Sequence, residues 1–175
     1  MNKTNNSRKQ KSRQKIKDAY VALVLENKDP SFITVSDVCK KAQINRSTFY
    51  GHYLDMDDLY ADVCAWLVTR FKKLFEDGAE TKEGTFDFLK LFRCIKEDPS
   101  FFETCFRLNA DVKSVFVPEG FSSVGAKIYD DPIRLEYHVA FFEAGMMAIT
   151  RKWLDSGCKE SPEEMAQILR EEYNR

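Results

Sequence analysis

The chain has 175 residues, 43% of them hydrophobic, and a net charge of −1. It is long enough to bury a sizeable core. It has neither an apolar run of about 18 residues nor an apolar signal-peptide core at its N-terminus, so we expect a cytoplasmic protein rather than a membrane or secreted one. The five cysteines are odd in number and show no CxxC spacing. They are expected to be reduced, buried residues rather than a disulfide framework or a zinc site, with a redox sensor as the alternative.

The near-neutral total conceals a very uneven distribution of charge. Residues 1–53 hold eleven basic and four acidic residues, a net charge of +7, whereas residues 54–175 carry −8. The first seventeen residues include seven basic residues and no acid. We expect residues 1–11 to form a basic arm that is disordered in isolation and could lie along DNA phosphates or in a minor groove. A merely solubilising tail is the alternative.

A first helix is predicted from about Ser12 to Asn27, because apolar residues recur there at three- and four-residue spacing. Lys28-Asp29-Pro30 would end this helix, since proline cannot continue it.

Two short helices joined by a tight turn are predicted next. Thr34, with Asp37 three residues later, caps the first of them, and Asn45 is a good N-cap for the second. The turn is Gln43-Ile44-Asn45, and the second helix begins at Arg46. This pattern is typical of the helix-turn-helix, in which the second helix enters the major groove of DNA.

The stretch ITVSDVCKKAQINRSTFYGHY at residues 33–53, with the DDL at 57–59, closely resembles the TetR family of bacterial transcriptional regulators. The resemblance implies an all-α protein, with a three-helix DNA-binding head at residues 12–56 and a helical regulatory and dimerisation body at 57–175. It also implies a homodimer that binds a double-stranded DNA operator. The candidate DNA-contacting residues are Thr34, Asn45, Arg46, Ser47, Thr48, Tyr50 and His52.

Two positions depart from the usual form of that family. Gln43 stands where the family usually has glycine, and a non-glycine residue in a left-handed turn costs roughly 1 kcal/mol. Met56 stands where the family often has a lysine that touches a DNA phosphate. Losing one phosphate contact would make the slope of log affinity against log salt concentration less steep by roughly one unit.

The body is predicted to consist of further helices. The first runs from Asp57 to about Phe75, is capped by Asp55 and could connect the head to the body. Helices at 85–96 and 100–109 follow, whereas 110–132 is predicted to form short turns and loops. The body is rich in aromatic residues, which either line a ligand pocket or form the core. The candidate ligand-binding residues are Phe71, Phe75, Phe92, Phe106 and Phe141.

The last forty residues predict two helices, at 133–156 and from Ser161 onward, the second with serine as its N-cap and Pro162 at its first position. The segment FFEAGMMAITRKWLDSGCKESPEEMA resembles a TetR-family branch that includes regulators of dihydroxyacetone kinase operons. The resemblance implies a dimer interface on these helices, with an intrachain helical hairpin as the alternative. The candidate interface residues are Tyr137, Phe141, Gly145, Ile149, Trp153, Met165, Ile168 and Leu169.

An enzyme is not expected, nor a cofactor or a metal. The only histidines are His52 and His138, neither has a partner at metal-ligand spacing, and no phosphate-binding glycine loop or GxSxG elbow is present. The expected function is therefore a DNA-binding regulator. Within it we expect a repressor released by a small apolar effector, and the alternative is a co-regulator whose body binds a partner protein.

Overall fold

The computed structural model describes residues 3–27, 29–76, 87–110 and 131–173, and these residues form helices and loops without any β-strand. The predicted all-α class is confirmed. The chain divides into two compact units, one made of Met1–Leu67 and Thr104–Ala110 and the other of Val68–Glu103 and Asp111–Arg175. Among the described helices we find none with the length and apolar character that crossing a membrane requires.

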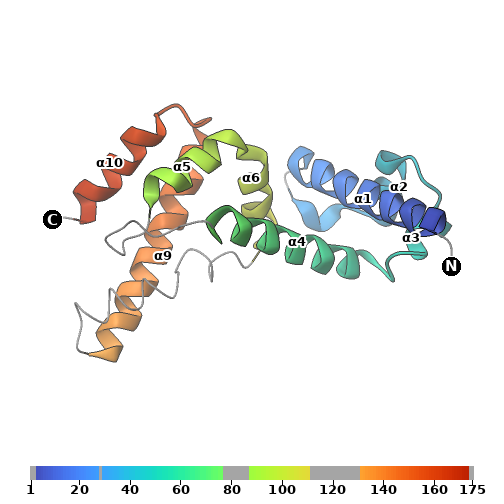
Figure 1. Ribbon diagram of the computed structural model, residues 1–175, viewed down its shortest axis with the longest axis horizontal. Coiled ribbons are helices and arrows are strands. Elements are labelled where there is room, and N and C mark those ends of the chain that lie inside the picture. The colour runs from blue at the N-terminus through green and yellow to red at the C-terminus, as the bar shows by residue number, and fades with distance from the viewer. Residues whose placement is uncertain (1–2, 28, 77–86, 111–130, 174–175) are drawn as a thin grey trace. The chain divides into compact units, whose positions relative to one another are not determined.

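The first unit contains, in chain order, α1 (Lys3–Glu26), the 3-10 turn η1 (Pro30–Phe32), α2 (Val35–Ala42), α3 (Arg46–Tyr50) and the first part of α4 (Met56–Glu76) (Figure 1). The end of α6 (Pro99–Arg107) also belongs to it. Their inward-facing side chains form one apolar core. The core includes Ile16, Tyr20, Val24, Val38, Phe49, Leu59 and Val63, all buried. Each such side chain stabilises the fold by about 1.5–3 kcal/mol, so this core fixes where the short helices α2 and α3 lie.

The first helix begins earlier than the sequence predicted. It starts at Lys3 rather than near Ser12, so a basic arm without structure over residues 1–11 is not what the described part of the chain contains. The physical reason is that no proline or glycine precedes Pro30, and Lys, Arg and Gln are good helix formers. The seven basic residues at the N-terminus are therefore carried largely on a helix.

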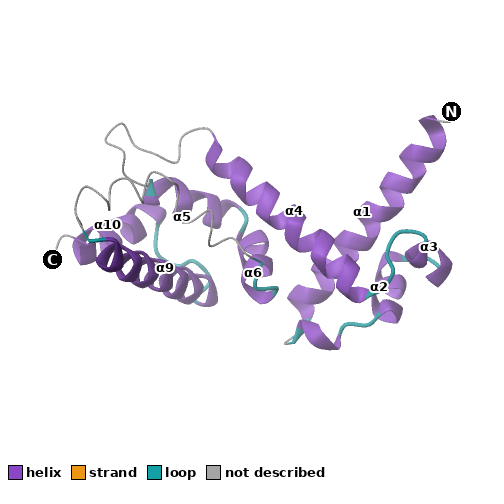
Figure 2. Ribbon diagram, turned by 90° about the horizontal axis from the view of Figure 1, so that it is seen from below, coloured by secondary structure: helices purple, strands orange, loops and turns teal. Residues whose placement is uncertain are grey.

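The second unit contains the rest of α4, with α5 (Phe88–Glu97), most of α6 (Pro99–Arg107), α9 (Pro132–Asp155) and α10 (Pro162–Tyr173) (Figure 2). α5 packs against α10. On the surface, the Arg93 guanidinium lies 2.7 Å from the Glu163 carboxylate. Beneath that ion pair is a shared core. It is formed by Leu91, Phe92 and Ile95 of α5, Phe142, Met146 and Trp153 of α9, and Met165, Ala166 and Leu169 of α10.

Helix ends that were predicted from capping residues are found where expected. The Asp58 amide donates to the Asp55 carboxylate at 2.9 Å before α4. At α10, the Glu164 amide donates to the Ser161 hydroxyl at 3.2 Å, and the Ser161 amide donates to the Glu164 carboxylate at 2.7 Å. Most of the loop predicted at 110–132 lies outside the described residues, and so does the side chain of Phe75.

Candidate nucleic-acid interface

The first helix of the predicted motif is fixed by a capping box. The Asp37 amide donates to the Thr34 hydroxyl at 3.3 Å, and the Thr34 amide donates to the Asp37 carboxylate at 2.9 Å. The Thr34 hydroxyl also donates to that carboxylate at 2.6 Å. These bonds from Thr34 hold the pKa of Asp37 below its usual value. The Thr34 hydroxyl is thus engaged by the cap both as a donor and as an acceptor.

The turn between α2 and α3 depends on a left-handed residue. Gln43 has φ 54° and ψ 50°, a left-handed conformation that favours glycine. The turn is closed by the Ile44 amide, which donates to the Cys39 carbonyl at 3.0 Å. The strain predicted at Gln43 is therefore present, at a cost of roughly 1 kcal/mol, but the turn keeps the shape that a helix-turn-helix requires.

The short helix α3 has one buried and one exposed side. Phe49 is 0% exposed and contacts the ring of Tyr53, with centroids 5.7 Å apart. Arg46 and Ser47 are exposed, and Tyr50 is 54% exposed. A five-residue helix has little stability of its own, so burial of Phe49 is what holds it in place. Its outer side is then free to meet a partner.

One predicted cap is made differently. Asn45 occupies the N-cap position of α3, but its side chain makes no capping hydrogen bond. Its backbone carbonyl accepts from the amides of Thr48 and Phe49 at 3.0 and 3.3 Å. The side-chain amide of Asn45 is exposed and is not occupied by the helix end.

A partly buried network behind α3 joins α1 to α4 within the first unit. The Tyr53 hydroxyl, almost fully buried, donates to the Asp62 carboxylate at 2.8 Å. Arg13 lies 3.0 Å from the same carboxylate and donates from Nε to the Tyr53 oxygen at 3.4 Å, and Lys17 lies 3.6 Å from Asp62. Burial raises the pKa of Tyr53 to about 12. The sequence analysis missed this network, although the i, i+4 spacing of Arg13 and Lys17 does place them on one side of α1.

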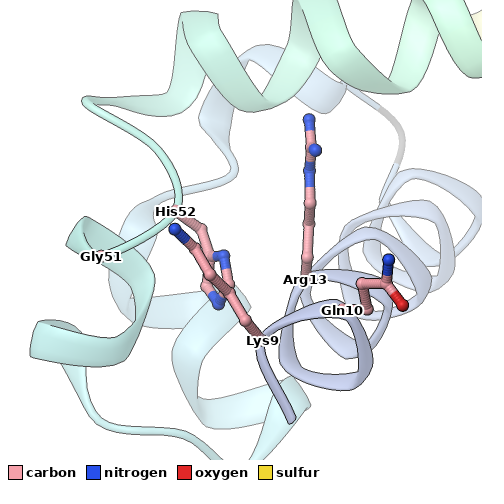
Figure 3. A pocket seen from close by; sticks show the side chains of 5 residues that line it. All are labelled: Lys9, Gln10, Arg13, Gly51 and His52. Atoms are coloured by element: carbon pink, nitrogen blue, oxygen red, sulfur yellow. The ribbon is translucent and has the colours of Figure 1, made fainter. Parts of the chain in front are cut away.

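His52 connects the segment after α3 to the same helix. Its Nε2 lies 2.7 Å from the Ser12 hydroxyl of α1. Burial, followed by the charges of Lys9 and Arg13, lowers the pKa of His52 below its usual value. These residues surround a shallow cavity of about 380 Å³ (Figure 3). The cavity is lined by Lys9, Gln10, Arg13, Gly51 and His52.

Comparisons with known proteins agree with this geometry. Residues 120–174 match a family described as a transcriptional regulator C-terminal region of the TetR type. The chain is 24% identical, over 71% of its length and 70% of the relative's, to the HTH-type dhaKLM operon transcriptional activator DhaS of Lactococcus lactis subsp. lactis (strain IL1403). These similarities support a TetR-type transcriptional regulator. The predicted resemblance is thereby confirmed.

Two further similarities concern shorter or more distant matches. The chain is 35% identical over 49 residues to the uncharacterized HTH-type transcriptional regulator YxbF of Bacillus subtilis (strain 168), an alignment that spans 28% of this chain and 13% of that protein. A solved structure of the dihydroxyacetone kinase operon activator DhaS shares its fold, with a TM-score of 0.51 and 21% identity over 91% of this chain and 92% of that one. Regulators of this family bind DNA, which accords with the exposed side of α3.

The aromatic residues predicted to bind a ligand differ in exposure and in their ring contacts. Phe71 contacts Phe102 with ring centroids 5.8 Å apart, and Phe92 contacts Trp153 at 5.2 Å. Phe141 is 77% exposed. Phe106 lies on α6. Aromatic spacing along the sequence could not predict these surroundings, because each depends on which helix packs beside the ring.

The predicted dimer-interface residues fall into two groups. Trp153, Met165 and Leu169 are buried within the chain's own core, so this part of the prediction needs correction. The reason is that α5 of the same chain packs against α10, and its Phe92 ring contacts Trp153 of α9. In contrast, Tyr137, Phe141 and Ile168 are exposed, and Gly145 and Ile149 are half-buried. Ile133, which the sequence analysis did not select, is exposed beside them.

Proposed function

We propose that this regulator reads a specific operator with the outer side of α3. The observation that carries the proposal is the contrast between exposed Arg46, Ser47 and Tyr50 and fully buried Phe49 on one short helix. Arg46 occupies the first position of α3, and a guanidinium there can donate two hydrogen bonds to O6 and N7 of guanine in the major groove. We assign base reading to Arg46 and Ser47.

The neighbouring polar groups suit contacts to the DNA backbone. Such contacts fix the register of a protein on the duplex and carry no sequence information themselves. The hydroxyl groups and the side-chain amide around α3 can donate hydrogen bonds to phosphate oxygens, and His52 lies directly after them in the chain. The residues assigned to phosphates are Asn45, Thr48, Tyr50 and His52, whereas the Thr34 hydroxyl donates within its own cap.

The regulator is proposed to act as a homodimer, with residues 57–175 as the regulatory and dimerisation domain. Ile133, Tyr137 and Phe141 recur every four residues along α9 and leave an exposed apolar stripe. A second copy that covers this stripe around a two-fold axis would bury it without any change in either chain. Gly145, Ile149 and Ile168 would lie at the margin of that contact.

Two candidate modes of regulation follow. In the first, the regulator is a repressor, and a small apolar effector in the second unit releases it from DNA. In the second, it is a co-regulator whose second unit binds a protein partner. The exposure of Phe141 favours the second mode, as does the description of the Lactococcus lactis relative as an activator.

Selection of bound duplexes from a random DNA library tests the proposed function. We expect enrichment of an inverted repeat, because two copies of α3 would meet two half-sites about one helical turn apart. A library with no sequence enriched over the input would refute sequence-specific binding. Placing the enriched site upstream of a reporter gene then separates the two directions of control, since a repressor lowers expression and an activator raises it.

A further inference from the structure

The cavity between α1 and the segment after α3 has the chemistry of an anion site. Lys9, Gln10 and Arg13 project from α1, while Gly51 and His52 lie on the segment that follows α3 (Figure 3). Two of the five lining residues carry a fixed positive charge, two more offer nitrogen donors, and none is acidic. A group of this composition binds an oxyanion by charge-assisted hydrogen bonds.

The guanidinium of Arg13 is held in position and still accessible. Its contacts with Asp62 at 3.0 Å and Tyr53 at 3.4 Å fix its orientation, and its side chain remains 53% exposed. A guanidinium has five N–H donors, so these two contacts leave donors for a further ligand. The Tyr53–Asp62 pair thus orients one of the cations of the cavity.

Gly51 lines the cavity without a side chain. Its backbone has φ −74° and ψ −9°, a conformation that every residue type adopts. A Cβ added there would meet the carbonyl oxygens of Ser47 and Thr48, each at 3.4 Å. The backbone therefore does not require glycine at this position.

We propose that this cavity binds one backbone phosphate of the operator, adjacent to the bases that α3 reads. The inference rests on the proposed function and extends it to Lys9, Gln10 and Arg13 of α1. The two surfaces are close in the chain, because Gly51 and His52 follow Tyr50, the last residue of α3. A phosphate bound here would hold α1 and α3 against the same DNA strand.

The histidine gives this phosphate site a distinctive signature. The groups that face His52 are Lys9 and Arg13 of α1, with Tyr53 beside it at 6.3 Å between ring centroids, and Asp62 of α4 acts through Arg13. Burial and the two cations depress the pKa of His52 and so favour its neutral form in the free protein. A phosphate in the cavity reverses that electrostatic balance and raises the pKa. Binding then takes up a proton, so DNA affinity rises as the pH falls.

The test measures binding of a fluorescein-labelled DNA duplex of mixed sequence by fluorescence anisotropy, as a function of salt and pH. Lys9→Gln should lower the slope of log K against log salt by about 0.9, the value for one phosphate contact. The matched control is Lys15→Gln, which removes the same charge from an exposed position of α1 that does not line the cavity. It should leave the slope unchanged.

The pH arm uses the two histidines of the chain as a matched pair. Between about pH 5.5 and 8, the affinity of the wild-type regulator should fall as the pH rises, by up to tenfold per unit for one proton taken up. His52→Gln should abolish this dependence, and His138→Gln in the second unit should retain it. Circular dichroism of each variant confirms that it is folded.

The possible results distinguish a failure of the phosphate site from a failure of the proposed DNA-binding function. Equal slopes for Lys9→Gln and Lys15→Gln, or a pH dependence that persists in His52→Gln, would overturn the phosphate site while leaving a DNA-binding regulator. A wild-type regulator that binds no duplex at any salt concentration would overturn the proposed function itself.

Discussion

Replacing Tyr53 by phenylalanine should weaken the first unit measurably, because it removes one hydroxyl from the network behind α3. The hydroxyl donates to the Asp62 carboxylate at 2.8 Å in a nearly fully buried position. A hydrogen bond to a charged group contributes about 1.5–3 kcal/mol to stability. Asp62 keeps Arg13 and Lys17, so the carboxylate is not left without a partner. We therefore expect Tyr53→Phe to lower the free energy of unfolding by about 2 kcal/mol, the lower part of that range.

Urea unfolding followed by far-ultraviolet circular dichroism measures this loss as a lower midpoint at unchanged slope. Tyr50→Phe is the matched control, since it removes the same atom from an exposed ring on α3 and should change stability by less than about 0.5 kcal/mol. If Tyr53→Phe and Tyr50→Phe unfolded at the same urea concentration, the network would not stabilise the unit, and the reasoning would be refuted.

Three further predictions follow from named residues. Burial raises the pKa of Tyr53 and of Tyr20 to about 12 from an ordinary value of 10.0. The free energy of unfolding should therefore be highest below about pH 10 and should fall as the pH rises toward 12. Urea midpoints measured over a pH series check this, and Tyr53→Phe should make the fall less steep. Gln43→Gly should raise the free energy of unfolding by up to about 1 kcal/mol by relieving the left-handed strain, and an unchanged or lower urea midpoint would count against strain at that turn. Tyr137→Glu should shift the regulator from dimer to monomer in sedimentation velocity. Gln167→Glu adds the same charge to an exposed position of α10 and should leave the dimer intact. A Tyr137→Glu variant that remained dimeric would show that α9 is not part of the interface.

The sequence predicted the features that depend on local chemistry. The capping boxes at Thr34 and Ser161 and the left-handed turn at Gln43 follow from rules that involve residues three or four positions apart, and the structure contains all three. Helix ends without such a signal were less predictable. The start of α1 is one example, because nothing in the residues before Ser12 breaks a helix.

Features that depend on tertiary packing could not be predicted from the sequence. The pairing of Arg13 with Asp62 joins residues far apart in the chain, and no local pattern connects them. The same limit applies to Met165 and Leu169, where the apolar spacing of α10 indicates a buried side but not whether α5 or a second chain covers it. The cavity beside His52 likewise exists only once α1 lies against the segment after α3.

The central claim is that α3 reads bases, and the affinity ratio between an operator and a scrambled duplex tests it most directly. Take the duplex enriched from the random library and measure that ratio for wild type and for Arg46→Ala. We predict that Arg46→Ala lowers the ratio, and that the difference in binding free energy between the two duplexes shrinks by roughly 1–3 kcal/mol at one half-site position. Tyr50→Phe should weaken binding to both duplexes about equally. An Arg46→Ala regulator that lost the same affinity for operator and scrambled DNA would contradict the account.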